Sequence, residues 1–511
     1  MDPLQQAQLT QQILAAIGKA YKSPISDPAI VALLGKATFN QPGSATTGLN
    51  FYDLEAGAKM LYPVLTPLRN IIPRTSGKGG IQANWRAVTG INTTGMRAGV
   101  SDGNRGGVIS VATADYTAAY KGLGLESSVT FEAQYSGQGF DDVRAIAAKT
   151  LLESTMIQEE YTILGGNGAA VALGTTPTPT LADITTGGTL LANTEYSVIC
   201  VALTLDGYLN GSVAGGIQAQ IVRTNADGSS DTFGGGAARK SANATVTTAN
   251  DASNTHKVSA SVTVVTGAVA YAWFWGAAGA EVLGAITTIN SVVISANATG
   301  TQTAASLPAA DWSQNALVFD GLLYQAWKTG SNAYIASQAS GTAGTGTPLT
   351  SDSAGGIVEI DTMLKSMWDN YRLTPDTLWV NAQEALNISK KILANGSSGS
   401  QRFVFNVDQG VLAGGVMVRS YLNRFSMAGG SEIPIRIHPN IAPGTLLATT
   451  NKLPYPLSNV ANVFQIRERQ SYYQIEWPLR SRKYEYGVYV DEVLQHYFPP
   501  SMGIITNIGN G

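Results

Sequence analysis

The sequence has little cysteine and little charge, and both shortages exclude classes of protein. Cys200 is the single cysteine in 511 residues, so no disulfide can form within the chain. Charged residues make up 13% of the sequence and the formal net charge is -3, so no overall basic field is present to hold nucleic acid by its phosphates. We therefore expect stability to come from packing and association, and any contact with DNA to be weak and non-specific.

Targeting and membrane signals are also missing. The N-terminus carries no basic segment followed by an apolar run and a cleavage site, and no stretch of about 18 apolar residues occurs anywhere. This pattern predicts a soluble protein made in the cytosol, without membrane contact. Because the chain starts with Met1, we also expect that no N-terminal propeptide has been removed.

What the sequence does have is apolar content and glycine. Hydrophobic residues at 44% are enough for buried cores, and the length is typical of about three domains. The 56 glycines, with many Ala, Ser and Thr residues, indicate a loop-rich protein with many strands. Helix-like and strand-like segments alternate after residue 312, so the predicted fold class is α+β.

The longest helical pattern covers residues 140–164, which would span about 36 Å. Asp141 and Asp142 suit its positive N-terminal end, and glycines from Gly165 onward stop it. A second apolar face lies nearly opposite the first, so we expect the helix to be gripped on two sides. The first face consists of Val143, Ile146, Ala147, Leu151, Ile157, Tyr161 and Leu164, and Asp142, Lys149, Glu153 and Glu160 form a charged ridge between the faces.

Residues 62–129 contain a long hairpin pattern. Ile81, Ala83, Trp85 and Ala87 alternate with polar residues, a tip rich in Gly, Asn, Thr and Ser covers residues 89–107, and residues 108–121 form the returning strand. An isolated two-stranded ribbon is marginal in water, and this one has too few large apolar residues for its own core. A neighbouring copy of the chain is the economical candidate to hold it.

Residues 175–306 have few charges and contain short apolar runs separated by turn signals. This pattern predicts a seven-strand β-sandwich of immunoglobulin type that is inserted into a loop. We expect the rest of the chain to fold without this insertion. The aromatic residues expected to help fill its core are Tyr271, Trp273, Phe274 and Trp275. Beyond it we predict helices over residues 357–371 and 382–393, a strand over 375–381, and closing strands over 463–468, 472–477 and 484–494.

The sequence offers little catalytic or metal chemistry. His256, His438 and His496 are isolated from one another and from the cysteine, so we expect surface or packed residues and no metal site. The run at residues 75–80, TSGKGG, lacks the earlier glycine and the Ser or Thr after lysine that a phosphate loop needs. We expect neither an enzyme nor a cofactor.

Two charged groups remain. Glu159 and Glu160 are adjacent on the predicted helix and point about 100° apart, so we interpret them as a solvated or salt-bridged face and exclude a converging acid pair. A basic group near the C-terminus is interpreted as forming inter-subunit ion pairs, in preference to contacts with DNA. It consists of Arg467, Arg469, Arg480, Arg482 and Lys483.

The order of these parts resembles the major capsid proteins of tailed bacteriophages, of the Hong Kong 97 type. The motifs that carry the resemblance are YTAAYKGLGLESSVTFEA at 116–133, ILGGNG at 163–168, FDGLLYQ at 319–325, PDTLWVNAQEAL at 375–386 and EYGVYVDEVLQHYFPPSMGIITNI at 485–508. The resemblance covers about residues 1–170 and 310–511. Family members often run from the helix end almost directly into a motif like FDGLL, so residues 175–306 are interpreted as an inserted surface domain.

The resemblance implies a domain map and a set of partners. Residues 1–61 would be an N-terminal arm, 62–125 the extended E-loop, 126–174 the peripheral domain with its spine helix, 307–356 a return segment, 357–454 the axial domain and 455–511 the closing strands of the peripheral domain. Self-assembly into hexamers and pentamers of an icosahedral virion shell around double-stranded DNA would follow. A portal, a separate scaffold or decoration protein, and weak glycan contact by the inserted domain are the other expected partners.

The resemblance also implies which residues take part in assembly. Inter-subunit contacts are expected from the E-loop residues Lys78, Trp85, Arg86, Arg97 and Arg105, and packing of the spine helix from Val143, Leu151, Ile157 and Tyr161. Two alternatives remain: a glycan-binding surface protein whose β-sandwich is the functional unit, and a bacterial nanocompartment shell of the same fold. The chains of such compartment shells are shorter than this one and lack an insertion of this kind.

Overall fold

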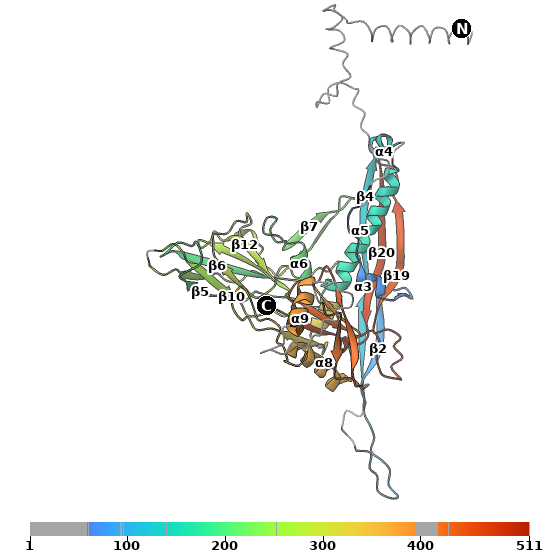
Figure 1. Cartoon of the computed structure of the whole chain (residues 1–511). Helices are drawn as coiled ribbons and strands as arrows, with labels where there is room; N and C mark the ends of the chain where they lie inside the picture. The colour runs from blue at the N-terminus through green and yellow to red at the C-terminus, as the bar shows by residue number, and fades with distance from the viewer. Residues whose placement is uncertain are drawn as a thin grey trace, which may run out of the picture. The chain divides into compact units, whose positions relative to one another are not determined.

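The computed structural model describes residues 59, 61–91, 95, 97–138, 141–251, 253–393, 417–427 and 429–509. The chain divides into two compact units, residues 1–59 and 60–511, and the helices and strands of Figure 1 that carry labels belong to the second unit. Of the N-terminal arm expected over residues 1–61, residues 1–58 and 60 lie outside the described residues. None of the described helices is long and apolar enough to span a membrane.

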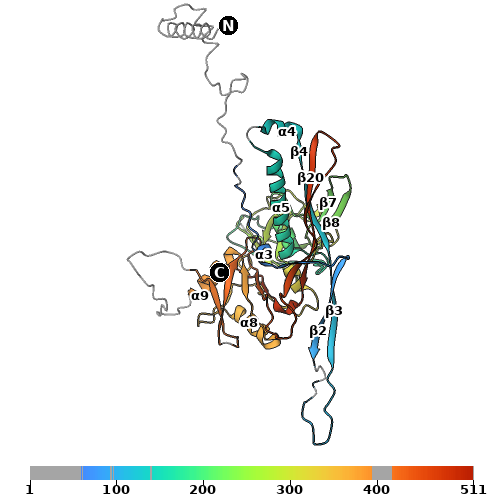
Figure 2. The ribbon, with the colours of Figure 1, turned by 90° about the vertical axis from the view of Figure 1, so that its right-hand side faces the viewer.

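The predicted hairpin is present. Strand β2 (Gln82–Ile91) pairs antiparallel with β3 (Val111–Ala119), with one irregularity between Val88 and Gly90. Only Tyr120 separates β3 from β4 (Lys121–Thr130), so the returning strand of the hairpin leads directly into the next sheet. The predicted boundary at residue 125 therefore falls inside a continuous strand. Both views show the ribbon of β2 and β3 projecting from the end of that sheet (Figure 2).

A four-stranded sheet receives the hairpin, in the order β1-β19-β20-β4. The short strand β1 (Arg74–Ser76) runs parallel to β19 (Phe464–Glu476), and β20 (Lys483–His496) pairs antiparallel with both β19 and β4. The two closing strands predicted over 463–468 and 472–477 form the single strand β19. The residues between them, near Gln470, form bulges in its pairing with β20.

The spine helix α5 (Val143–Gly165) begins at Asp142, whose side chain accepts hydrogen bonds from the amides of Arg144 and Ala145. Its N-terminal half packs on the four-stranded sheet through Leu151, Val129, Tyr486 and Val488. Its C-terminal half enters the central core, where Ile163 and Leu164 are fully buried. Shorter helices lie before it: α3 (Pro67–Ile71) and α4 (Phe131–Gly137).

Two motifs that lie about 150 residues apart in the sequence meet at the end of the spine helix. The amide of Gly321, just before α7 (Leu322–Trp327), donates to the carbonyl oxygen of Gly166 at 2.7 Å. A Cβ added at Gly321 would lie 2.5 Å from the backbone oxygen of Thr162, so only glycine allows this approach. Asp320 accepts hydrogen bonds from the amides of Ala169 and Ala170. The contact explains the glycines in both motifs.

A second sheet of six strands has the order β14-β21-β18-β15-β17-β16, with α8 (Val358–Tyr371) and α9 (Ala382–Leu393) packed on it. The predicted helices over residues 357–371 and 382–393 match these two closely. Its strands are β14 (Tyr334–Ser337), β15 (Thr377–Val380), β16 (Ser420–Asn423), β17 (Ser431–Ile437), β18 (Leu446–Thr449) and β21 (Gly503–Thr506). Because β21 pairs with β18 and β14 in this sheet, it does not belong with the closing strands of the peripheral domain, as the domain map had placed it.

Residues 175–306 form two facing sheets of three and four strands, in the orders β13-β10-β5 and β12-β11-β6-β9. The two sheets together have seven strands, and the immunoglobulin type of the insertion stays a prediction. Here the first strand, β5, pairs with β10. A separate hairpin joins β7 (Gln220–Thr224) to β8 (Ser230–Gly234), and the sandwich strands are β5 (Thr180–Ile184), β6 (Glu195–Leu203), β9 (Ala244–Thr247), β10 (Lys257–Ser261), β11 (Ala270–Gly276), β12 (Val282–Thr287) and β13 (Ser291–Ile294).

The sandwich is docked on the rest of the chain. Leu205 and Val269 belong to the central core together with Leu164 and Leu322. The hydroxyl of the fully buried Tyr324 accepts from the amide of Leu205 at 3.1 Å and donates to the carbonyl of Gly267 at 3.0 Å. A second contact joins Asn290 of the sandwich to Asn507. The insertion therefore shares a hydrophobic core with the part of the chain into which it is inserted.

Candidate assembly site

The β2–β3 hairpin has apolar side chains that the described part of the chain leaves exposed. Exposed fractions are 79% for Ile81, 61% for Val88, 71% for Ile91, 85% for Val108 and 55% for Val111. A two-stranded ribbon cannot bury such residues by itself, and contiguous exposed apolar surface marks a site of protein contact. The hairpin is therefore the candidate assembly site.

Trp85 was expected at an inter-subunit contact, and the structure gives it partners within its own chain. It stacks on Tyr116, its cross-strand neighbour, with ring centroids 5.8 Å apart, and meets the edge of Tyr497 at 5.7 Å. The contact with Tyr497 fastens the hairpin to the end of β20. Trp85 thus serves the root of the hairpin, because its ring is already partly covered there.

The other predicted assembly residues are exposed. Lys78 lies in the turn between β1 and β2, and Arg86 forms an ion pair with Asp115 across the two strands at 2.7 Å. Arg97 and Arg105 lie in the tip and make no ion pair with the described residues. Lys78 likewise makes no ion pair with the described residues, so Arg86 is the one of these four cations that is already paired. On the spine helix, Leu151 is buried while Val143, Ile157 and Tyr161 are half-buried.

The root of the hairpin is fixed by a buried network of charges. Glu159 of the spine helix, fully buried, pairs with Arg69 at 2.6 Å and with Arg74 of β1, and it accepts a hydrogen bond from Tyr472. Arg74 also pairs with Glu468 at 2.5 Å and with Glu492 at 3.2 Å. This network joins β1, the spine helix, β19 and β20 at the point where the chain enters the hairpin.

Glu160 was predicted on a charged ridge between the two apolar faces of the helix, and the structure places it in the interior. It is fully buried because it accepts hydrogen bonds from the amides of Leu68 and Arg69 and contacts Nε2 of His438 at 2.6 Å. Glu159 and Glu160 do point to different partners, as expected for adjacent helical residues. The interpretation of this pair as a salt-bridged face was correct for Glu159, and the alternative of a solvated face was wrong for both residues.

The histidines are all buried and lie apart. His438 contacts Glu160, and burial lowers the pKa of His496 to about 3, which keeps it neutral. Among the residues that the structure describes, no group of three His, Cys, Asp or Glu side chains is placed to hold a metal ion. Sequence reasoning missed the networks around Glu159 and His438 because their members are far apart in the chain; the only signal was the pair of adjacent glutamates in a helix otherwise rich in apolar residues.

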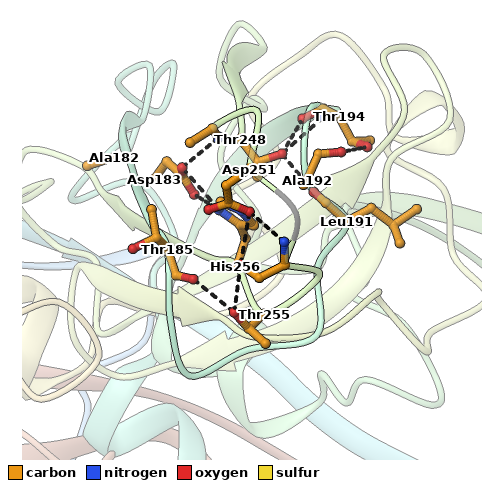
Figure 3. Close-up of polar contacts among 12 residues, drawn as sticks. Ala182, Asp183, Thr185, Leu191, Ala192, Thr194, Thr248, Asp251, Thr255 and His256 are labelled. Atoms are coloured by element: carbon orange, nitrogen blue, oxygen red, sulfur yellow. Dashed lines mark hydrogen bonds and ion pairs between the residues drawn. The ribbon is translucent and has the colours of Figure 1, made fainter.

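His256 lies in a network of polar contacts within the sandwich, between carboxylates from two segments (Figure 3). Its Nδ1 lies 3.0 Å from Asp183 of β5, and its Nε2 lies 3.1 Å from Asp251 in the loop before β10. The hydrogen bonds to Asp251 and then Asp183 raise the pKa of His256 above its usual value, against the effect of burial. The protonated ring, which donates from both nitrogens, is the form that satisfies both carboxylates.

The aromatic residues of the sandwich are buried and do not form a binding platform. Tyr271, Trp273, Phe274 and Trp275 are at most 7% exposed, as predicted for core residues. Leu191 and Val222 are the exposed large apolar side chains in the described part of residues 175–306, and neither is aromatic. The expected glycan contact through exposed aromatic residues therefore has no basis in this part of the chain.

No protein-family model matches this chain. No curated protein matches it either. Among solved structures it is similar to a chain from the capsid of a native GTA particle, with 9% identity, a TM-score of 0.41 and coverage of 92% of this chain and 100% of the other. It is also similar to a chain from the capsid of Myoviridae phage XM1 (10% identity, TM-score 0.39, coverage 91% and 100%) and to one from an encapsulin complex of Synechococcus elongatus (8%, 0.34, 89% and 93%).

The fold class follows from the elements themselves. A long hairpin is followed by a spine helix that ends in glycines, by an α+β lobe with a central sheet, and by long closing strands that pair with the strand leading out of the hairpin. This is the order predicted from the sequence motifs. The described chain is α+β, with the hairpin, spine helix and closing strands in the order that the sequence predicted.

Proposed function

We propose that this chain is the major capsid protein of a tailed bacteriophage and assembles into hexamers and pentamers of an icosahedral head around double-stranded DNA. In this role it is structural and works as part of the virion. Its main partner is a second copy of itself. A portal and a separate scaffold or decoration protein would complete the particle, and contact with DNA would be weak because the net charge is -3.

The exposed apolar hairpin is the observation that carries the proposal. It holds apolar side chains in water on a ribbon without a core, yet its root is fixed by buried ion pairs to a rigid helix and sheet. A flexible ribbon would need no such anchoring. A projecting arm that must meet a neighbour at a defined angle does need it, because binding is weakened by any freedom that the contact has to remove.

Neither alternative has an observation that favours it. A glycan-binding adhesin would use exposed aromatic rings, whereas the aromatic side chains of the sandwich fill its core. A nanocompartment shell of the same fold would share the hairpin and the spine helix, and the insertion distinguishes this chain from it. The contents of purified particles, packaged DNA or a cargo protein, separate these two shells.

The hairpin can be tested with a matched pair of variants. Val88 and Val222 are both exposed valines in two-stranded hairpins, at 61% and 64%, but only Val88 lies on the proposed contact ribbon. We expect Val88→Lys to give a folded subunit with at least about tenfold less particle formation, because a buried unpaired lysine is costly at an interface. Val222→Lys should assemble normally. Sedimentation and electron microscopy measure both.

The contrary results are equally clear. Normal icosahedral particles from Val88→Lys would remove the hairpin from the contact. A wild-type chain that stays monomeric at high concentration, with circular dichroism showing a folded protein, would contradict the capsid function itself.

A further inference from the structure

The charge network at the hairpin root contains more acid than base. Three carboxyl groups, Glu159, Glu468 and Glu492, surround the two guanidinium groups of Arg69 and Arg74. Glu159 and Glu492 have no exposed side-chain surface, and Arg69, Arg74 and Glu468 have 15%, 25% and 16%. In so dry a site, charges are screened little, and one surplus negative charge is expensive.

The remaining groups near the network do not neutralise this surplus. Tyr472 donates its hydroxyl hydrogen to Glu159 and is neutral. Lys121 of β4 lies opposite Glu492 in the sheet. Its ammonium group donates a hydrogen bond to the backbone carbonyl of Ala316 at 2.6 Å. Glu160 and His438 form a separate contact with the amides of α3.

Glu492 is the carboxyl group best placed to carry a proton. One of its oxygens contacts Arg74, while the other, Oε1, is buried and receives no hydrogen bond from the described residues. An ionised carboxylate would place a second buried negative charge beside Glu159, whereas a protonated carboxyl is neutral and can donate its hydrogen to Glu159. Burial and then the charge of Glu159 raise the pKa of Glu492 to about 8, against the effect of Arg74.

We propose that a proton on Glu492 locks the root of the hairpin to the spine helix, and that loss of this proton releases β1 and frees the hairpin to change its angle. Ionised Glu492 repels Glu159 and competes with it for Arg74, which is the only guanidinium that contacts both among the described residues. Arg74 is part of β1, so its displacement pulls on the chain just before Gly77 and the hairpin.

The direction of the pH effect follows from the raised pKa. Stability from the lock is fully present below the pKa of about 4.5 that Glu492 has when unfolded and is lost as the pH rises through about 8. Between these two values, opening becomes about tenfold more favourable for each pH unit, because the opened root releases the proton that the closed root holds, and above about 8 the dependence levels off. The lock is therefore closed at neutral pH and opens in alkaline solution.

Hydrogen exchange at two backbone amides reports the lock directly. The amide of Gly77 donates a hydrogen bond to the backbone carbonyl of Glu468 at 2.6 Å, and the amide of Ile466 donates one to the backbone carbonyl of Pro73 at 3.0 Å. Both bonds join the hairpin root to β19. In the wild-type chain, protection of these amides, corrected for intrinsic exchange, should fall by up to about tenfold per pH unit as the pH rises from about 4.5 to about 8, and should level off above that. Glu492→Gln, which mimics the protonated carboxyl, should keep its protection.

Glu476→Gln is the matched control, since Glu476 lies on neighbouring β19, is 58% exposed and pairs only with Arg144. It should behave as the wild type. Loss of protection in Glu492→Gln over the same pH range as the wild type, or full protection of the wild type at alkaline pH, would overturn the lock. If Glu492→Gln does not fold, infrared difference spectra decide: the band of a protonated carboxyl group must disappear from the wild type through the same pH range.

This inference rests on the proposed function only for the use of the hairpin in assembly. Exchange at Gly77 and Ile466 tests the lock in subunits and particles alike. Absence of particles with a normal pH response would therefore refute the capsid proposal and leave the lock in place.

Discussion

At the scale of single residues, burial decides what a charged side chain does. His256 is buried between Asp183 and Asp251, and Glu160 is buried against two amides and His438. Each is held by partners from distant segments. A charged residue in such a place stabilises the fold only in the protonation state that its partners require.

His256 leads to a prediction about the pH dependence of the sandwich. Because its pKa is raised in the folded chain, its stabilising effect is present at acidic pH and is lost as the pH rises through that pKa. His256→Gln has one donor group and can serve only one of the two carboxylates, so it should melt earlier and lack this pH-dependent part. Thermal denaturation followed by the fluorescence of Trp273 and Trp275 at several pH values measures the difference. Equal pH profiles for both proteins would contradict the prediction.

The residue scale is also where sequence reasoning reached least far. The helical pattern placed Glu160 on a charged ridge, since its period gives faces but not what covers them. The isolation of the three histidines in the sequence could not reveal that each is buried. Partners such as Arg74 and Glu492, 418 positions apart, leave no local signal.

At the scale of elements, local sequence patterns were sufficient to predict those helices and strands that depend on their own periodicity. The predicted helix over residues 382–393 matches α9, and the long hairpin and spine helix are present because alternation and helical period are properties of short segments. The pairing order of the sandwich and its docking were not predictable. They depend on contacts such as that of Tyr324 with Leu205 and Gly267, which join separate segments.

This docking reverses one expectation from the sequence: we now expect the chain without residues 175–306 to fold poorly, because its central core would lose Leu205 and Val269. Tyr324→Phe tests the contact in a graded way. The change leaves the buried amide of Leu205 and the carbonyl of Gly267 without a partner, which should cost about 1–3 kcal/mol of unfolding free energy. Denaturant titration measures this loss, and Tyr135→Phe, at a position 70% exposed, is the neutral control. An unchanged midpoint in Tyr324→Phe would mean that the insertion is only tethered.

At the scale of the whole molecule, the positive charges of the hairpin tip have no ion-pair partner among the described residues. Arg97 and Arg105 are exposed without an ion pair among the described residues, whereas Arg86 is already paired with Asp115. In an assembly of identical chains, unpaired cations on a projecting arm are available to acidic groups of a neighbour. Attraction between such exposed charges weakens as salt is added, because the Debye length is only about 8–10 Å at 0.10–0.15 M salt.

We therefore expect the double variant Arg97→Gln and Arg105→Gln to assemble less at low salt and to show a flatter dependence of assembly on salt concentration. Arg86→Gln, which removes a cation already neutralised within the hairpin, should follow the wild type. Light scattering over a salt series measures all three proteins. Identical salt dependence in the double variant and the wild type would show that the tip arginines take no part in assembly.

The continuity of β3 with β4 has a mechanical consequence. A pull on the hairpin passes through Tyr120 into β4, and all 10 residues of β4 are in register with β20. Since antiparallel hydrogen bonds lie perpendicular to the strands, tension along the strand loads them together in shear, and they do not open one after another like a zipper. A force that pulls the hairpin along its own length therefore acts in the direction in which this joint resists most.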